Sequence, residues 1–312
     1  MSLISFFVIL SLLLVLFSNI TVFFFNIYVS FSRCLLIEHE NNSEDIIIRI
    51  IFLINVNKFY FVVNLYFSMI SKQKIKFISS LKHNKYRLKS NCFIAEGEHV
   101  VNSFIDSNFE IKFILSTNDL SDLYQKLDYS MITKKELYKI SCLKNPSNIL
   151  AVIVKKKIEF TPKNINYEFP IILLDGVSDP GNMGSIIRTA DWFGINSIYV
   201  SDDCVDVFNP KVVQATMGSL ARVSVYRVNL PNLVCNLKKH NVTCYGACLS
   251  GDNIYKLNKQ SKSALVFGNE SHGISVQLQE KLDKKILIPS KNKFIDSLNV
   301  AVSFGIILSE FR

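Results

Sequence analysis

The chain has 312 residues, of which 49% are hydrophobic and 20% are charged, and its formal net charge is +9. This composition indicates a globular protein that is long enough for more than one domain, rather than a disordered chain. Seven cysteines without a C-x-x-C pair argue against a zinc site or a disulfide framework and favour reduced thiols in the cytosol.

The first 68 residues form an apolar N-terminal extension. Residues 1–32 contain no charge and are long enough to span a bilayer, and residues 46–68 are a second apolar stretch. Three interpretations are open: a membrane anchor of one or two helices, a signal segment, or residues translated from AT-rich DNA upstream of a natural start at Met69. No basic region precedes the apolar run, which argues against a signal segment. The abundance of Phe, Ile, Leu and Asn favours the third interpretation.

The rest of the chain is basic. The first 68 residues carry three basic and four acidic residues, which leaves 32 basic and 22 acidic residues, a net charge of +10, for residues 69–312. Such an excess favours a polyanionic partner, nucleic acid first, although many basic proteins have no such partner. Residues 72–89 are the most basic, and their apolar residues recur at near-helical spacing. They predict a short helix with a cationic face for phosphates, or simply a solvated face.

Residues 92–154 alternate between strand and helix patterns. We predict strands at 92–95, 111–115, 129–132 and 149–154, and helices at 98–105, 120–127 and 134–140. This alternation predicts a small three-layer α/β domain, to which we assign residues 69–158. The charged residues 155–170 include two prolines and predict a linker into a second domain at 159–312.

The second domain begins with a strand, a loop, a helix and a strand. The strands are Ile171–Leu174 and Ser197–Val200, the loop spans 175–184 and the helix is Ser185–Phe193, so a parallel βαβ unit is expected. Ligands of such sheets bind beyond the carboxyl ends of the strands, and the free N–H groups of the helix favour an anion. The sequence matches neither a Walker A loop nor a G-x-G-x-x-G dinucleotide loop. The alternative to an anion-binding loop is a turn with a purely structural role.

The C-terminal part continues the alternation. We predict helices at 209–220, 230–240 and 297–311, and strands at 223–227, 242–247, 264–267 and 285–288. The loop GNESHG follows the strand at 264–267. Its His272 is a candidate for contact with a bound ligand, but a histidine in such a loop is more often simply a polar loop residue.

Three motifs occur in order along this region: DPGNMGSIIRTADWFG at 179–194, LVFGNESHGIS at 265–275 and IPSKNKFIDSLNVAVS at 288–303. They resemble the motifs of the SpoU-type, TrmH-like RNA 2′-O-ribose methyltransferases of the SPOUT superfamily. The basic region before them, with FIAEGEHVV at 93–101, resembles the L30e-like substrate-binding domain of many members. The resemblance covers about residues 72–312 and leaves 1–68 unexplained.

The resemblance implies a C-terminal SPOUT α/β domain with a trefoil knot, an obligate homodimer whose active sites are each completed by the neighbouring subunit, and no metal. It implies S-adenosyl-L-methionine as the cofactor, in contact with Gly268, Ile288 and Leu298. The stretch between Pro289 and Ser297 is one residue longer than is usual in the family, with no glycine, so the shape of the cofactor loop is expected to differ.

The resemblance also implies the catalytic residues. The family has an arginine at the position of Arg188 near the ribose 2′-OH, and an asparagine at the position of Asn182 that orients it. Glu270, Ser297 and Asn299 match other polar positions of the site. Because a guanidinium stays protonated in proteins, Arg188 is expected to stabilise the developing alkoxide and clamp a phosphate rather than act as a base.

The sequence therefore predicts a cytoplasmic S-adenosylmethionine-dependent RNA 2′-O-methyltransferase. Ribosomal RNA is favoured over tRNA, because an L30e-like domain suits folded RNA recognised by shape. The alternatives are a tRNA 2′-O-methyltransferase, a non-catalytic RNA-binding assembly factor, and a membrane protein if residues 1–68 belong to the mature chain.

Overall fold

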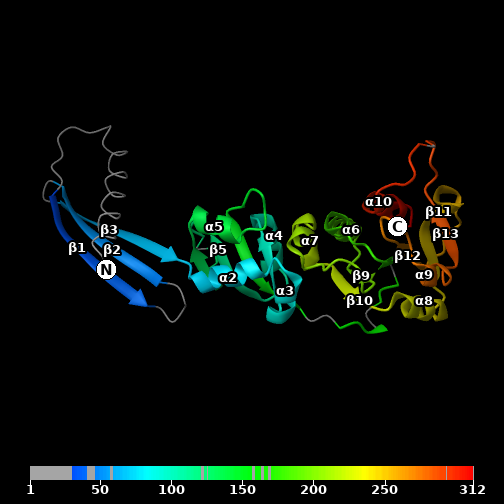
Figure 1. Ribbon diagram of the computed structural model, residues 1–312, viewed down its shortest axis with the longest axis horizontal. Coiled ribbons are helices and arrows are strands. Elements are labelled where there is room, and N and C mark those ends of the chain that lie inside the picture. The colour runs from blue at the N-terminus through cyan, green and yellow to red at the C-terminus, as the bar shows by residue number, and fades with distance from the viewer. Residues whose placement is uncertain are drawn as a thin grey trace. The chain divides into compact units, whose positions relative to one another are not determined.

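The computed structural model describes residues 30–40, 46–56, 59–120, 123–124, 126–156, 159–162, 165–167, 170–292 and 294–311, with side chains from residue 70 onward. The chain divides into two compact units, Met1–Ser71 and Lys72–Arg312 (Figure 1). The predicted domain boundaries after residues 68 and 158 stay predictions.

The N-terminal unit contains an antiparallel sheet of the strands β1 (Ser30–Glu40), β2 (Ile46–Val56) and β3 (Phe59–Met69), in that order. Residues 46–56 and 59–68 are thus strands rather than a helical span, in keeping with the strand preference of their many Ile, Val, Phe and Tyr residues. Residues 1–29, most of the other candidate span, lie outside the described residues. Within the described part, no helix has both the length and the apolar character that a membrane crossing needs.

Residues 72–154 form the small domain. Its helices are α2 (Lys72–Ser80), α3 (Asn84–Ser90), α4 (Glu98–Ile105) and α5 (Lys134–Ile140), and its strands are β4 (Cys92–Glu96), β5 (Ile111–Ser116), β6 (Tyr129–Met131) and β7 (Ile149–Val154). The sheet order is β4-β7-β5-β6, in which only β5 and β6 run parallel. Buried side chains on both faces of the sheet confirm the three-layer prediction.

Two predictions for the small domain need correction. The basic stretch 72–89 is two helices, because the chain turns at 81–83 between α2 and α3. The helix predicted at 120–127 is absent from the described residues there, which form turns. The hydroxyl of Tyr129 accepts a hydrogen bond from the N–H of Leu120 at 3.0 Å and donates one to the carbonyl of Asn118 at 2.5 Å. These bonds hold the start of the segment as a turn.

Residues 171–311 form the large domain. Its strands are β8 (Ile171–Leu174), β9 (Ser197–Val200), β10 (Ser224–Arg227), β11 (Thr243–Asn253), β12 (Ser263–Phe267) and β13 (Lys284–Leu287). Its α-helices are α6 (Pro180–Trp192), α7 (Pro210–Ala215), α8 (Leu230–Lys239), α9 (Val276–Gln279) and α10 (Val300–Phe311), with short 3-10 helices η2 (Ser219–Ala221) and η3 (Ile254–Lys256). The sheet is parallel throughout, in the order β10-β9-β8-β12-β11-β13.

Helices cover both faces of this sheet. Ile186 of α6 and Phe304 of α10 pack in the core on one face, and Leu233 of α8 and Leu278 of α9 pack on the other. Strands buried on both faces explain the continuous apolar runs of the sequence. The three-layer α/β class is confirmed, and the threading of the chain that a trefoil knot requires stays a prediction.

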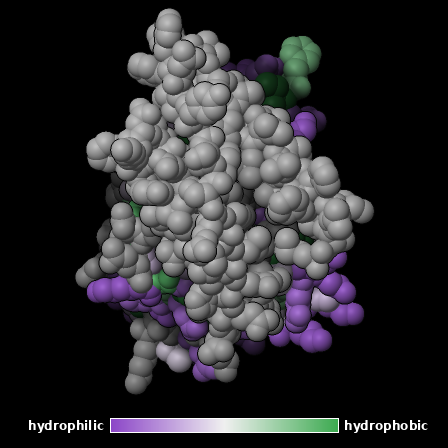
Figure 2. Space-filling model, turned by 90° about the vertical axis from the view of Figure 1, so that its left-hand side faces the viewer, coloured by the Kyte–Doolittle hydropathy of each residue, from purple (hydrophilic) through white to green (hydrophobic). Residues whose placement is uncertain are grey.

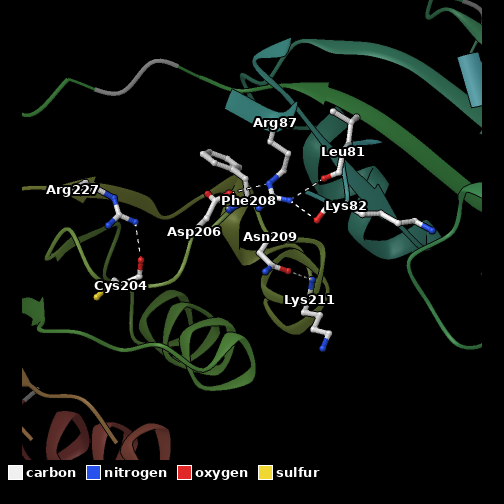
Figure 3. Close-up of polar contacts among 9 residues, drawn as sticks. All are labelled: Leu81, Lys82, Arg87, Cys204, Asp206, Phe208, Asn209, Lys211 and Arg227. Atoms are coloured by element: carbon white, nitrogen blue, oxygen red, sulfur yellow. Dashed lines mark hydrogen bonds and ion pairs between the residues drawn. The ribbon is translucent and has the colours of Figure 1, made fainter. Parts of the chain in front are cut away.

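The small and large domains pack against each other (Figure 3). Arg87 of α3 is 2% exposed, and its Nε and Nη2 donate to Oδ2 of Asp206 at 2.9 and 2.8 Å. Its Nη1 donates to the carbonyls of Leu81 and Lys82, both at 2.9 Å. The ring of Phe208 packs on that of Phe93 at a tilt of 42°, with the ring centres 4.8 Å apart. Arg87 was expected on a cationic surface and instead joins the two domains.

The predicted linker at 155–170 contains no strand or α-helix among its described residues, but it is not detached from the large domain. The ring of Phe160 packs on the rings of Tyr199 and Tyr226 at 5.5 and 5.9 Å, and Ile165 is buried.

Seen from the side shown in Figure 2, described hydrophilic residues gather at the lower margins and a small apolar group lies at the upper margin.

Candidate active site

The loop after β8 leads into α6, whose first turn is built by its own sequence. Asp179 is the N-cap, and its Oδ1 accepts the N–H of Asn182 at 2.8 Å. Pro180 occupies the first helical position, where no N–H is needed. The helix therefore begins at Pro180, five residues earlier than predicted, so Asn182 lies within its first turn.

Glu270, from the loop after β12, lies against this helix start. Its carboxylate accepts hydrogen bonds from Nδ2 of Asn182 at 2.9 Å, the N–H of Asp179 at 3.3 Å, and the Oγ and N–H of Ser178 at 3.3 and 3.5 Å. Burial raises the pKa of Glu270, but these hydrogen bonds outweigh burial and bring the pKa below its usual value. The carboxylate of Glu270 therefore lies just before the start of α6, at the end of the helix where the dipole favours a negative charge.

Asn182 joins this pair to the third motif. While its Nδ2 donates to Glu270, its Oδ1 accepts from Nδ2 of Asn299 at 2.8 Å. The Oδ1 of Asn299 caps α10 by accepting the N–H groups of Ala301 and Val302 at 2.9 and 3.2 Å. Three of the five predicted catalytic residues, one from each motif, therefore form a single hydrogen-bonded chain.

Sequence reasoning missed two residues that fix these loops. Nδ2 of Asn269 donates to the carbonyl of Gly176 at 2.7 Å, and its Oδ1 accepts the N–H of Ser271 at 2.8 Å. Asp175, which is buried, accepts the N–H of Ser275 at 2.7 Å. The available signal was their position at strand ends: Asp175 is the first residue after β8, and Asn269 is the second after β12. The ring Nδ1 of His272 and its backbone N–H both lie 3.2 Å from Oδ1 of Asn269, contacts that are typical of a polar loop residue.

The other two predicted catalytic residues lie outside this chain of hydrogen bonds. Arg188 is exposed on α6 and has no hydrogen bond or ion pair to any described residue. It lies eight residues after Pro180, about 12 Å along the helix axis, and therefore in the third turn of α6. Ser297 is exposed, and it too has no hydrogen-bond partner among the described residues.

The predicted cofactor residues line the same loops. A Cβ at Gly268 would collide with the backbone of Gly273 and Ile274, so only glycine allows the loop after β12 to fold back this closely. Ile288 is partly buried against the core, and Leu298 is 47% exposed. A tightly turned backbone beside exposed apolar side chains fits a ligand with an adenine ring, held mainly by backbone groups.

The lengthened third motif is accommodated without glycine. Oγ of Ser290 donates to the carbonyl of Asn292 at 2.7 Å and accepts its N–H at 3.1 Å, and Oδ1 of Asn292 accepts the N–H of Phe294 at 2.9 Å. These side chains form the turns that a glycine would otherwise form. The turn leaves the side chain of Phe294 97% exposed.

The described residues of this site contain no cluster of metal ligands and no thiol whose pKa is lowered. Within the described residues no three His, Cys, Asp or Glu side chains gather as a metal would need. Burial, followed by the charge of Asp283, raises the pKa of Cys244 to about 12, and burial also raises the pKa of Cys204. Such thiols stay protonated and unreactive.

Comparison with known proteins identifies both domains. Residues 170–309 match the SpoU rRNA Methylase family, and residues 72–151 match the MRM3-like substrate binding domain. The chain is 34% identical over 246 residues to the 23S rRNA (guanosine(2553)-2′-O)-methyltransferase RlmP of Bacillus subtilis, covering 77% of this chain and 96% of that protein.

Solved structures of RNA methyltransferases are also similar to this chain. A putative RNA methyltransferase of the TrmH family from Porphyromonas gingivalis is similar with a TM-score of 0.69 and 32% identity, over 78% of this chain and 98% of that one. An AdoMet-bound rRNA methyltransferase from Sinorhizobium meliloti is similar with a TM-score of 0.70 and 27% identity, over 78% and 96%.

The fold and these similarities thus identify an S-adenosylmethionine-dependent RNA 2′-O-ribose methyltransferase with a substrate-binding domain before it. The chain belongs to the SpoU family.

Proposed function

We propose that this enzyme methylates the ribose 2′-OH of a guanosine in large-subunit ribosomal RNA, and that it acts in the cytoplasm. The names of two relatives support the substrate: the Bacillus subtilis protein acts on a guanosine of 23S rRNA, and so does RlmB of Neisseria meningitidis, which is 31% identical over 157 residues. The observation that carries the proposal is the hydrogen-bonded chain of Glu270, Asn182 and Asn299.

This chain positions the site rather than performing the proton transfer. The carboxylate of Glu270 already accepts four hydrogen bonds from the loop 178–182, and both ends of the Asn182 amide are engaged. Groups fixed in this way need no reorganisation when charge develops, which is the basis of electrostatic catalysis. We assign Glu270, Asn182 and Asn299 as positioning residues that hold the three motif loops at one spacing.

Arg188 carries the catalytic charge in this proposal. Its guanidinium is exposed and has no partner among the described residues, so it remains available to RNA. The attacking 2′-oxygen becomes more negative as its proton leaves to water, and a planar, permanently charged fork stabilises that oxygen and the neighbouring phosphate. Holding the hydroxyl in line supplies much of the remaining rate.

The cofactor supplies a methyl group made electrophilic by the sulfonium charge. Gly268, Ile288 and Leu298 hold it in this proposal, with backbone contacts from the first and apolar contacts from the other two. The exposed Ser297, one residue before Leu298, is assigned to contact with RNA or cofactor at the same loop.

We further propose a two-fold dimer. Trp192 of α6 is 86% exposed and Val302 of α10 is 51% exposed. The exposure of such apolar side chains to water is unfavourable and is typical of a protein–protein interface. Trp192 lies one helical turn from Arg188, so burying it against a partner would enclose the catalytic arginine. The dimer would then complete each active site.

The test is methylation of transcribed large-subunit rRNA by the purified chain with labelled S-adenosylmethionine, followed by mapping of ribose methylation. Bulk tRNA and small-subunit rRNA serve as competing substrates, and RNA from cells lacking the gene shows which ribose loses its methyl group.

Methylation of one guanosine of large-subunit rRNA is the expected result. Methylation confined to tRNA would replace the proposed substrate with the alternative. Calorimetry that detects RNA binding without S-adenosylmethionine binding would favour the non-catalytic assembly factor.

A further inference from the structure

A cleft of about 720 Å³ opens where the small domain meets the edge strand β10 of the large domain. On the small-domain side it is lined by the end of α4 and the turn after it, including residues 106–109. On the other side it is lined by residues 220–225 and Arg227 and by the loop after β9. None of these residues belongs to the three motifs of the candidate active site.

The lysines of the linker give the cleft a positive charge. Lys155 and Lys156 both line it, and Lys156 is exposed with no partner among the described residues. The Nζ of Lys155 lies 5.0 Å from the ring centre of Phe208, so its ammonium is at the cleft wall. Asp106 is the acidic residue that opposes them from the small domain.

The two arginines of the cleft differ in how much positive charge they add to it. Arg227 donates to the carbonyl of Cys204 (Figure 3) and to those of Ser201 and Asp202. These neutral partners leave its positive charge uncompensated. Arg222 is paired with Asp191, with Nη2 and Oδ2 2.6 Å apart.

Asp206, the second acidic residue of the lining, is paired with Arg87 at 2.8 Å and therefore adds no net negative charge.

Apolar surface lies beside the charges. Phe109 and Phe208 line the cleft and are half-buried, and Leu88 at its rim is 66% exposed. Aromatic rings beside lysines and arginines are the combination that binds single-stranded nucleic acid, because bases stack on the rings while phosphates pair with the cations.

We propose that this cleft binds a single-stranded stretch of the substrate RNA next to the target ribose, an inference that rests on the proposed function. Val200 is the last residue of β9 and Arg227 is the last residue of β10. In a parallel sheet the carboxyl ends of the strands lie side by side, so both residues lie at the same end of the sheet as Leu174, the last residue of β8. RNA in the cleft is therefore directed toward the loop at 175–182. The buried Arg87–Asp206 pair fixes the separation of the cleft walls.

The first test measures binding of a single-stranded RNA oligonucleotide by fluorescence anisotropy at several salt concentrations. The variant is Lys155→Gln/Lys156→Gln, and the matched control is Lys256→Gln/Lys284→Gln, which removes the same charge from two exposed lysines elsewhere. Loss of two phosphate contacts on a single strand lowers the salt slope of log K by about 1.4 and the affinity by about tenfold. Equal slopes for the variant and the control would overturn the proposal.

A second pair of variants does not depend on the half-buried Lys155. Leu88→Glu places a negative charge at the cleft rim, and Tyr138→Glu does so on α5, where the side chain is 65% exposed, close to the 66% of Leu88. RNA affinity is expected to fall about tenfold for Leu88→Glu and less than twofold for Tyr138→Glu, because only the first charge meets the RNA phosphates. Equal losses would contradict the assigned cleft.

Methylation assays on the same variants separate this inference from the proposed function. A wild-type chain that methylates rRNA, with cleft variants that bind and methylate as well as wild type, overturns the cleft and leaves the function standing. A wild-type chain that binds RNA through the cleft but methylates no rRNA overturns the function and leaves the cleft standing.

Discussion

Asn182 shows how much of the candidate site depends on one side chain. Its amide donates to Glu270 and accepts from Asn299, so its orientation is fixed by partners from two other loops. An aspartate there would place a carboxylate against that of Glu270, and an alanine would remove one hydrogen bond from each partner. Asn182 is therefore the residue through which the three motifs hold one another.

Arg188 gives the first prediction. Arg188→Ala is expected to cut turnover by about 10² or more, the scale of losing one donor to a developing oxyanion. Arg188→Lys should recover little, because an ammonium lacks the planar fork. Cofactor affinity should stay as in the wild type, since Gly268, Ile288 and Leu298 are assigned to it. Single-turnover methylation with parallel cofactor titration measures both quantities, and wild-type turnover would remove Arg188 from catalysis.

Glu270 gives a prediction about pH. Because its pKa is lowered in the folded chain, the ionised carboxylate stabilises the fold above the pKa it has when unfolded, and this stability is lost as pH falls through the folded value. Melting temperatures of wild type and Glu270→Gln should therefore differ between about pH 5 and 8 and converge in more acidic solution. Since Glu270 is exposed, solvent screening keeps the difference small. A difference that grows toward acid pH would contradict the assigned ionisation.

The motifs allowed Asn182, Glu270 and Asn299 to be predicted together, but their hydrogen bonds could not be. Which side-chain atoms meet depends on how three loops fold, and these loops are 88 and 117 residues apart along the chain. Asn269 and Asp175 were missed for the same reason, because their role is to shape loops. Arg188 and Ser297 remain predictions of the resemblance.

At the scale of elements, the start of α6 was mispredicted because Gly181 and Gly184 are typical of loops. In the folded chain Gly184 is helical, and a Cβ on it would collide with Ala215 and lie 3.0 Å from the carbonyl of Val212. The glycine is needed because α6 and α7 approach closely, a tertiary reason that local propensity cannot show. Strands such as β8 and β9 were predicted to the residue because they are short apolar runs with clear ends.

The loop after β12 gives a prediction at this scale. Gly268→Ala introduces a Cβ against the backbone of Gly273 and Ile274, so we expect a loss of about 1–3 kcal/mol of stability and weaker cofactor binding. Gly305→Ala in α10 is the matched control, because the nearest atom to its Cβ would be Cγ2 of Thr189 at 3.9 Å and alanine favours a helix. Urea unfolding and calorimetry compare them, and equal stabilities would contradict a tight loop.

At the scale of the whole molecule, the packing of the two domains could not be predicted. In a run of lysines and arginines every cation is typical of a phosphate contact, and no local signal marks Arg87 as the one that turns inward to Asp206. The predicted linker suggested independent domains, whereas residues 72–311 form one compact unit.

The proposed dimer is tested at the same scale. Trp192→Glu should give a monomer in light scattering and lose methylation, because it charges the surface assigned to the partner. Leu249→Glu is the control, since Leu249 is 77% exposed on β11, outside that surface. A Trp192→Glu chain that stays dimeric, or a monomer with full activity, would contradict the assigned interface.

The carboxylate of Glu270 at the start of α6 also determines which small molecules leave the enzyme undisturbed. Cells hold millimolar nucleotides and inorganic phosphate, and a vacant helix start would attract them. Here the position is already occupied by a carboxylate of the chain itself, so inorganic phosphate is not expected to bind there. Methylation rates measured with added inorganic phosphate, at constant ionic strength, are therefore expected to stay level.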